Sequence, residues 1–421
     1  MVTRRSCARF GWPAFMVCLA ALPAWAQQSS IQVQCPPAPK SPYATGVQCL
    51  HLSAGDGFAT MGDGTPLYVF SFSKLPVDGD PGAPGIQPVD PNLMMAAGTL
   101  AANIPAPTIT VKEGEELYLN LTNVGMIMRP DLSDPHSVHW HGFAQAAPVF
   151  DGVPDSSITI GMGASFPYFY LANDPGTYMY HCHVEATEHM QMGMLGNLYV
   201  EAKQNTLPAQ SFPNGFSHTP WNETTQTGNR YAYNDGDGST RYDVEVPIQI
   251  TSLDPVFHEA SITVQPLPFA DMKDRYFLLN GRGYPDTVRT STPCLPQTDH
   301  DAGSSNGETQ CVNALVTATP GQRVLLRLSN LSVTEYVTIG TNGIPMQVVG
   351  RDARLLRGDD GSPQYYTTNS INLGGGESAD VILDTTGLTA GSTYFLYAKN
   401  LNFLSNNAEN FGGAMTEIRI Q

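Results

Sequence analysis

The sequence predicts an all-β protein built from two Greek-key β-sandwich domains. Its 421 residues are too many for one average domain, so two is the natural count. Gly (40) and Pro (33) are plentiful and charged residues make up only 14%, which suits a β-rich chain with many turns. Short apolar and β-branched runs recur between turn signals, and no long amphipathic helical pattern interrupts them.

The first block of expected strands runs from about residue 51 to 202. Residues 108–111 and 117–121 flank a charged glycine turn, and residues 166–171 and 178–183 flank the turn Asn173-Asp174-Pro175-Gly176. Short strands at this spacing are typical of a Greek-key sandwich.

A second block of expected strands runs from about residue 241 to 421. It includes residues 323–328, 336–339, 379–383 and 394–397, and the polar segment 203–240 reads as a linker between the blocks. The stretches "PAPTITVKEGEELYLNLTN" and "VTATPGQRVLLRLSN" share a strand, a glycine turn and a strand ending in Asn. We therefore expect one sandwich unit to be duplicated within the chain.

The N-terminus has the pattern of an export signal. Three arginines precede the apolar residues 13–23, and Ala24-Trp25-Ala26 supplies a small-x-small cleavage pattern, so residues 1–26 are expected to be a signal peptide. Residues 27–50 then form an N-terminal arm. The apolar run is too short for a membrane span and no later stretch is long enough, so we expect an exported protein, periplasmic or secreted.

The charge balance limits the classes of partner. The formal net charge is -17, which argues against nucleic acid and against anionic membrane surfaces.

The cysteines point to one unusual thiol. Without the leader five remain, and Cys35–Cys49 and Cys294–Cys311 are plausible disulfides in an oxidising compartment. Cys182 is then left unpaired. An odd thiol in an exported protein is either a liability or a ligand.

Six of the ten histidines lie between residues 136 and 189, in two clusters around this thiol. They are His136, His139, His141, His181, His183 and His189. Side chains alternate along a strand, so Cys182 should point to one face while His181 and His183 point to the other. One strand can therefore serve two metal centres.

A thiolate, two imidazoles and a thioether form the ligand set of a type 1 (blue) copper site. Cys182, His189 and Met194 lie on one short stretch, and His136 would come from a neighbouring strand. A zinc site would normally close with four strong ligands and needs no distant Met. Scattered core histidines are the other alternative, but they would not gather around the unpaired thiol. We predict copper.

Residues 104–202 resemble a cupredoxin domain of the multicopper oxidase family. The resemblance rests on Pro105-Ala106-Pro107-Thr108, on His-Trp-His-Gly at 139–142 and on Tyr-His-Cys-His at 180–183. It implies two cupredoxin-like sandwiches and type 1 copper at the four ligands given above. By the same resemblance His139 would bind a type 2 copper, and His141, His181 and His183 would bind a type 3 pair. Asp151 matches an acid that relays protons to oxygen intermediates, with a simple turn aspartate as the equal alternative.

The sequence also departs from that family. The segment from Cys182 to His189 is two residues longer than usual, and Met190 and Met192 compete with Met194 as axial ligand. The second block resembles an oxidase domain in "FLLNGRGYPDT" and "TIGTNGIPMQVVGRD", but it has residues 335–339 where paired histidines would stand. Its His258 and His300 are isolated and expected at the surface. The chain thus offers four of the eight imidazoles of a trinuclear cluster.

Three functions follow from this half-cluster. The first is an oxidase in which O2 is reduced to water and two copies of the chain pool their imidazoles across a two-fold axis, as a homo-oligomer. The second is a blue-copper electron carrier or copper-binding protein with an incomplete cluster. The third, a nitrite reductase-like enzyme, fits least, because that family lacks the second His after Cys. Four buried imidazoles without metal would be costly, so we predict the oxidase.

The reductant is a small molecule or a metal ion. Five methionines lie in or near the copper segments, and thioethers are soft Cu(I) ligands, which makes cuprous ion a candidate beside other metal ions and phenols. The alternative is that these methionines pack the core.

Overall fold

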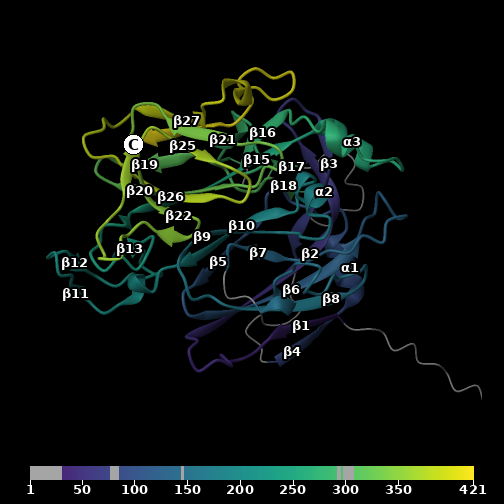
Figure 1. Ribbon diagram of the computed structural model, residues 1–421, viewed down its shortest axis with the longest axis horizontal. Coiled ribbons are helices and arrows are strands. Elements are labelled where there is room, and N and C mark those ends of the chain that lie inside the picture. Colours follow the sequence, from purple (N-terminus) through teal and green to yellow (C-terminus); the bar gives the residue numbers. More distant parts are fainter. Residues whose placement is uncertain (1–30, 76–84, 144–146, 292–294, 297–307) are drawn as a thin grey trace, which may run out of the picture.

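The computed structural model describes residues 31–75, 85–143, 147–291, 295–296 and 308–421. The expected signal peptide, Cys294 and His300 lie outside these residues. The described chain is mostly strands, and the all-β prediction is confirmed. In Figure 1 the N-terminal half (purple to teal) and the C-terminal half (green to yellow) form two β-rich bodies that contact each other.

The N-terminal body, domain 1, is a sandwich of two four-stranded sheets. One has the order β3-β2-β6-β8, with β2 Gly46–Thr60, β3 Pro66–Lys74, β6 Glu115–Gly125 and β8 Ser165–Leu171. The other has the order β5-β10-β9-β7, with β5 Ala106–Lys112, β7 His139–His141, β9 Gly176–His181 and β10 Leu195–Glu201. Leu119, Trp140 and Leu198 belong to the apolar core that both sheets share.

Domain 2 is a larger sandwich with a core of its own. Its seven-stranded sheet contains β15 Val244–Leu253, β16 Tyr276–Leu279, β20 Arg323–Asn330, β22 Met346–Arg351, β23 Arg354–Leu355, β24 Tyr366–Thr368 and β26 Ser378–Asp384. The five-stranded sheet contains β19 Val316–Ala318, β21 Val337–Thr341, β25 Ser370–Leu373, β27 Thr393–Ala398 and β28 Met415–Ile420.

The two domains repeat the same strand pairings. In domain 1, β5 pairs parallel to β10 and β6 pairs parallel to β2. In domain 2, β19 pairs parallel to β28 and β20 pairs parallel to β15. The two stretches that are similar in sequence, β5–β6 and β19–β20, therefore hold equivalent places in the two sandwiches, as the predicted duplication requires.

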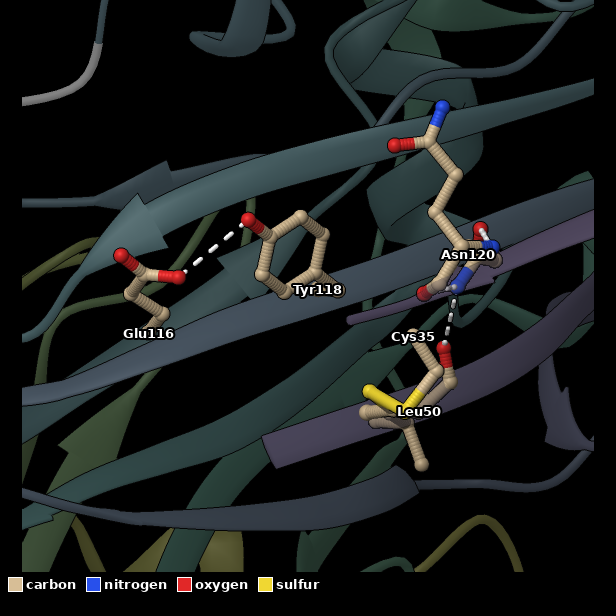
Figure 2. Close-up of a disulfide and its surroundings, with 7 residues drawn as sticks. Cys35, Leu50, Glu116, Tyr118 and Asn120 are labelled. Carbon is tan, nitrogen blue, oxygen red and sulfur yellow. Dashed lines mark hydrogen bonds between the residues drawn. A yellow bond between two sulfur atoms is a disulfide. The ribbon is translucent and has the colours of Figure 1, made fainter. Parts of the chain in front are cut away.

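The N-terminal arm is joined to domain 1 by a disulfide and by hydrogen bonds. Strand β1 (Ile31–Cys35) pairs with β4 (Gly85–Val89), and the predicted disulfide Cys35–Cys49 joins β1 to β2. Close to this disulfide, the Asn120 amide donates hydrogen bonds to the carbonyls of Gln34 (3.1 Å) and Leu50 (3.4 Å), as Figure 2 shows for Leu50. Since β2 begins at Gly46, the last residues of the expected arm belong to the first sheet.

The expected linker, residues 203–240, also packs against a domain. It contains the short strands β11 Gln210–Ser211, β12 Ser217–His218 and β13 Arg230–Tyr231, and β14 Arg241–Tyr242 follows it. Ala232 and Tyr233 are buried against Leu325 and Ile382 of the seven-stranded sheet. This segment therefore covers one face of domain 2.

Helices are few and short: α1 Pro91–Gly98, α2 Ala186–Gln191 and α3 Pro255–Ser261. No helix among the described residues is long and apolar enough to cross a membrane. Helix α3 contacts β3 of domain 1 and carries His258, which was expected at the surface. That expectation is wrong, because His258 is fully buried, with Nδ1 2.6 Å from the Tyr68 carbonyl and Nε2 2.9 Å from that of Gln191.

A buried ionic network joins the domains behind strand β9. Arg327 of β20 is fully buried, pairs with Glu245, and lies 3.3 Å from Asp380. Thr177 of β9 donates a hydrogen bond of 2.6 Å to the Asp380 carboxylate. The strand that leads to Cys182 is thus fixed from both domains.

Candidate metal centre

Strands β7 and β9 bring the two histidine clusters together. They pair antiparallel, with His139 opposite His181 and Trp140 opposite Tyr180. Trp140 points into the core, where it stacks on Phe143 with ring centroids 4.1 Å apart. Because side chains alternate along β7, His139 and His141 lie on the other face, as the sequence predicted.

The Cys182 thiol lies on the core side, just after β9 ends. Its Sγ is 3.2 Å from His189 Nδ1 and 3.9 Å from His136 Nδ1, and all three residues are fully buried. Backbone hydrogen bonds in both directions with Ile160 hold His136 in place. His189 is carried by α2, which begins after Glu185 in the left-handed region (φ 45°). The segment from Cys182 to His189, which the resemblance predicts to be longer than usual, thus includes the start of a short helix.

The electrostatics of this group favour a thiolate. Burial alone would raise the pKa of Cys182, but His189 and His136 beside it lower that pKa to about 5. For His189 burial lowers the pKa, while the charge of Cys182 and the contact with Asp134 raise it well above its usual value. A thiolate next to two imidazole nitrogens is a soft donor set suited to copper.

The three competing methionines occupy different places. Met194 is fully buried in the core that contains Cys182, and its carbonyl accepts a hydrogen bond of 3.1 Å from the Cys182 N–H. Met192 is buried in the same core. Met190 instead lines the pocket of the second histidine group.

The donor atoms of His136, Cys182 and His189 converge enough to hold one ion. They all lie within 4.8 Å of one another, and both buried imidazoles face the Cys182 Sγ through their Nδ1 atoms. The residues present therefore fit a copper ion.

The second histidine group lies on the opposite face of the strand end. The ring centroid of His139 is 5.8 Å from that of His141, 5.2 Å from that of His181 and 5.1 Å from that of His183. His141 Nδ1 and His181 Nε2 are 3.2 Å apart. All four predicted imidazoles meet at one place.

Hydrogen bonds from the Nδ1 atoms to backbone carbonyls orient two of these rings. Nδ1 of His139 donates to the Asp151 carbonyl (2.6 Å) and Nδ1 of His181 donates to the Cys182 carbonyl (2.8 Å), so that Nε2 of each ring carries the lone pair that can bind a metal. Burial lowers the pKa of His181 to about 3 and also lowers those of His139 and His141. Neutral imidazoles of this kind are ready metal ligands.

The four imidazoles line a pocket of about 500 Å³ whose opposite wall belongs to domain 2. That wall is formed by residues 331–336 and by Gly375 and Gly376. Gly376 lies so close that an added Cβ would be 2.9 Å from the His141 ring. No residue of this described wall is a histidine. The four histidines therefore fit part of a copper cluster, and the wall facing them adds no imidazole.

Asp151 lies beside the cluster rather than in its pocket. It follows the short 3-10 helix Pro148–Phe150, and besides the carbonyl bond its carboxylate Oδ1 is 3.5 Å from His139 Nδ1. The backbone of Asp151 orients His139. A role of its carboxylate in proton transfer stays a prediction.

Asp134 is a neighbour of the thiol site that the sequence reasoning missed. Its Oδ2 lies 3.2 Å from His189 Nε2, a distance for an ion pair without the alignment of a hydrogen bond. Glu185 completes a group whose donor atoms lie within 4.8 Å of one another. In the sequence, Asp134 could have been found from its position two residues before the proposed ligand His136.

Comparisons with known proteins agree with this geometry. Two family profiles described as multicopper oxidase match residues 90–205 and 268–418. "Multicopper oxidase MmcO" of Mycobacterium tuberculosis is 40% identical over 86 residues, which is 20% of this chain and 16% of the relative. "Copper resistance protein A" of Escherichia coli is 23% identical over 317 residues, which is 73% of this chain and 45% of the relative. The matches thus span less than half of these curated relatives.

Solved structures show the same fold at low sequence identity. The blue copper oxidase from Nitrosomonas europaea is similar with a TM-score of 0.59 and 21% identity, covering 89% of this chain and 86% of that one. The multicopper oxidase mgLAC is similar with a TM-score of 0.58 and 19% identity, covering 90% and 87%.

Proposed function

Because the chain belongs to the multicopper oxidase family, we propose that it is an exported oxidase that takes electrons from a reductant and reduces O2 to water. The observation that carries this proposal is the strand end at His181-Cys182-His183. Its thiol faces His136 and His189, while its two imidazoles face those of His139 and His141.

We assign type 1 copper to His136, Cys182, His189 and Met194. Copper held there would supply reversible one-electron chemistry at a thiolate ligand. The protein contributes a dry, preformed site, since all four side chains are fully buried. Backbone hydrogen bonds from Cys182 to Met194 and from Met194 to His189 keep the three in register.

We assign the oxygen-reducing coppers to His139, His141, His181 and His183. His139 would hold the type 2 ion and the other three would hold the type 3 pair. His181 and His183 are the chain neighbours of Cys182, so the two sites are joined by a short covalent path. Asp151 orients His139 through its carbonyl, and its carboxylate is our candidate for delivering protons.

The ligands missing from this second site would come from another copy of the chain. The described wall of domain 2 opposite the four histidines adds none, and the pocket of about 500 Å³ between them has room for further side chains. A two-fold homo-oligomer would supply the same residues twice.

Export is supported by the covalent structure. The Cys35–Cys49 disulfide indicates folding in an oxidising compartment, such as a periplasm or the cell exterior.

Copper analysis of the native oligomer together with O2 uptake tests the function. We expect more than one copper per chain, an intense visible band and O2 consumption with a suitable reductant. Cys182→Ser should abolish the band, whereas Ser137→Ala, next to His136, should keep it. One copper per chain with no O2 consumption on any reductant would refute the oxidase. A monomer with a full copper complement and full turnover would refute the shared cluster alone.

A further inference from the structure

A second hollow, of about 510 Å³, lies between domain 1 and the segment 203–240. Its walls come mainly from the turn between β5 and β6, from the end of β10, from the 3-10 helix Lys203–Thr206 and from residues 221–223. Among the described residues, its lining shares no member with that of the histidine pocket. Its volume falls in the range of roughly 300–1,000 Å³ that is common for ligand pockets. The chain thus has a cavity of ligand size away from its copper ligands.

The described lining carries four carboxylates and only two ammonium groups. Three of these carboxylates already have partners. Glu113 accepts a hydrogen bond from the Lys203 N–H (2.9 Å). Glu115 accepts one from the Lys112 N–H (2.9 Å), and Glu223 pairs with the Lys112 ammonium (2.6 Å). These contacts hold the walls together and leave one carboxylate over.

Glu201, at the end of β10, is the carboxylate that is left over. It is half-buried, and within the described chain its side chain makes no hydrogen bond or ion pair. Burial and the nearby Glu245 carboxylate raise its pKa, whereas Arg327 and Lys112 lower it. A carboxylate that is partly withdrawn from water without a partner is costly. A positively charged ligand group beside Glu201 would offset that cost.

Asn205 offers an unused hydrogen-bond donor in the same pocket. The residue is only 4% exposed, and its Oδ1 accepts a hydrogen bond of 2.8 Å from the Tyr231 N–H, which fixes the orientation of the amide. Its Nδ2 donates to no group of the described chain, although buried polar groups are rarely left without a partner. An oxygen atom of a ligand would satisfy this donor.

Trp221 supplies a flat apolar face to the lining. Its backbone N–H donates to the Asn205 carbonyl (2.7 Å), and the Arg230 guanidinium lies 4.6 Å from the centroid of its ring. These contacts fix the indole next to Asn205. The C–H face of a sugar ring packs well on an indole, and sugar hydroxyls both donate and accept hydrogen bonds. A sugar therefore matches Trp221 and Asn205 together, and an amino group on it matches Glu201.

We propose that this pocket binds an amino sugar. The ammonium group pairs with Glu201, a ring hydroxyl accepts the hydrogen bond from Asn205 Nδ2, and the apolar face of the ring packs on Trp221. The net charge of -17 also favours a cationic ligand over an anionic one. The proposal does not rest on the oxidase function, because the described lining contains none of the proposed copper ligands.

Ligand preference is tested by calorimetric titration of the native copper-loaded protein with glucosamine, at a pH where its amine is protonated. Glucose provides the same ring without the charge, and ethanolamine provides the amine without the ring. We expect glucosamine to bind about tenfold or more tightly than either. Binding of glucose or of ethanolamine as tight as that of glucosamine would overturn the assignment, and so would the absence of glucosamine binding.

The residues are tested with two substitutions in the pocket. Glu201→Gln keeps the shape and removes the charge, so it should weaken glucosamine binding about tenfold. Because the pKa of Glu201 is raised, loss of its charge should not destabilise the fold. Trp221→Leu should also weaken binding, and if it does not fold, Glu201→Gln decides alone. Glu259→Gln is the matched control, since Glu259 is exposed and outside the lining, and it should bind normally. Unchanged binding in Glu201→Gln, or equal weakening in Glu259→Gln, overturns the proposal.

Discussion

Asp134 Oδ2 lies 3.2 Å from Nε2 of His189, on the side of the ring away from Cys182. Burial on its own would raise the pKa of Asp134, but His189 beside it lowers that pKa, so the carboxylate is charged at neutral pH. A charged carboxylate behind a ligating imidazole increases its basicity and favours the higher oxidation state of a bound metal.

Asp134→Asn should therefore raise the reduction potential of the type 1 site. Replacing such a partner typically weakens metal binding about 10–100-fold, and each tenfold loss that affects Cu(II) alone corresponds to about 59 mV. A spectroelectrochemical titration measures this shift. Asp131→Asn is the control, because the exposed carboxylate of Asp131 pairs with Arg129 rather than with His189, so the substitution should leave the potential unchanged. A potential that falls or stays constant in Asp134→Asn would contradict the role assigned to this carboxylate.

Met194→Leu should keep the visible band but raise the reduction potential, because a weak axial thioether tunes the potential rather than holding the ion. Met190→Leu should change neither property, since Met190 lines the pocket of the other histidine group. Parallel redox titrations of the two variants provide the comparison. Met192→Leu distinguishes the remaining candidate, because Met192 is buried in the same core as Cys182. A shift in Met192→Leu alone would move the axial assignment to that residue.

Features that depend on local alternation were predictable from the sequence. Strands β5 and β6, which belong to different sheets, and the strand β9 that leads to Cys182 were expected within a few residues of their observed bounds. Side chains alternate along a strand, which predicted that Cys182 would lie on one face and its neighbouring histidines on the other. The same alternation predicted that Trp140 would be buried between His139 and His141.

Other features depend on contacts between distant segments. Strand β2 spans 15 residues, and it contains the buried polar residues His51 and Asp56, which interrupt an apolar strand pattern. Their burial depends on hydrogen bonds with Thr122 and Tyr68. Nothing local indicated that His258 would be buried against β3, because its partners are carbonyls 190 and 67 residues away. Likewise, the contact of Asp134 with His189 could not be predicted from the sequence, because it forms only when α2 places His189 beside Asp134.

Arg327→Leu should destabilise the protein strongly. The substitution would leave Asp380 without its paired cation and Glu245 with only Arg230, whose Nη1 lies 3.8 Å away, and breaking a buried pair typically costs about 3–5 kcal/mol. Denaturant unfolding followed by fluorescence measures the loss. Arg354→Leu is the matched control: its pair with Asp174 is exposed, so its loss should cost about 1 kcal/mol or less. Equal effects in the two variants would show that the buried network contributes no more than a surface pair.

Glu245 should make the stability of the protein depend on pH in the acid range. Burial would raise its pKa, but the Arg327 guanidinium lowers the pKa below its usual value, so the folded state binds this proton less readily than the unfolded chain. The stabilisation is therefore complete above the unfolded pKa of about 4.3 and is lost as the pH falls through the folded pKa. Unfolding free energies measured from pH 7 down to about pH 3 should decline less steeply in Glu245→Gln than in the parent protein. Identical slopes would mean that other carboxylates account for the acid sensitivity.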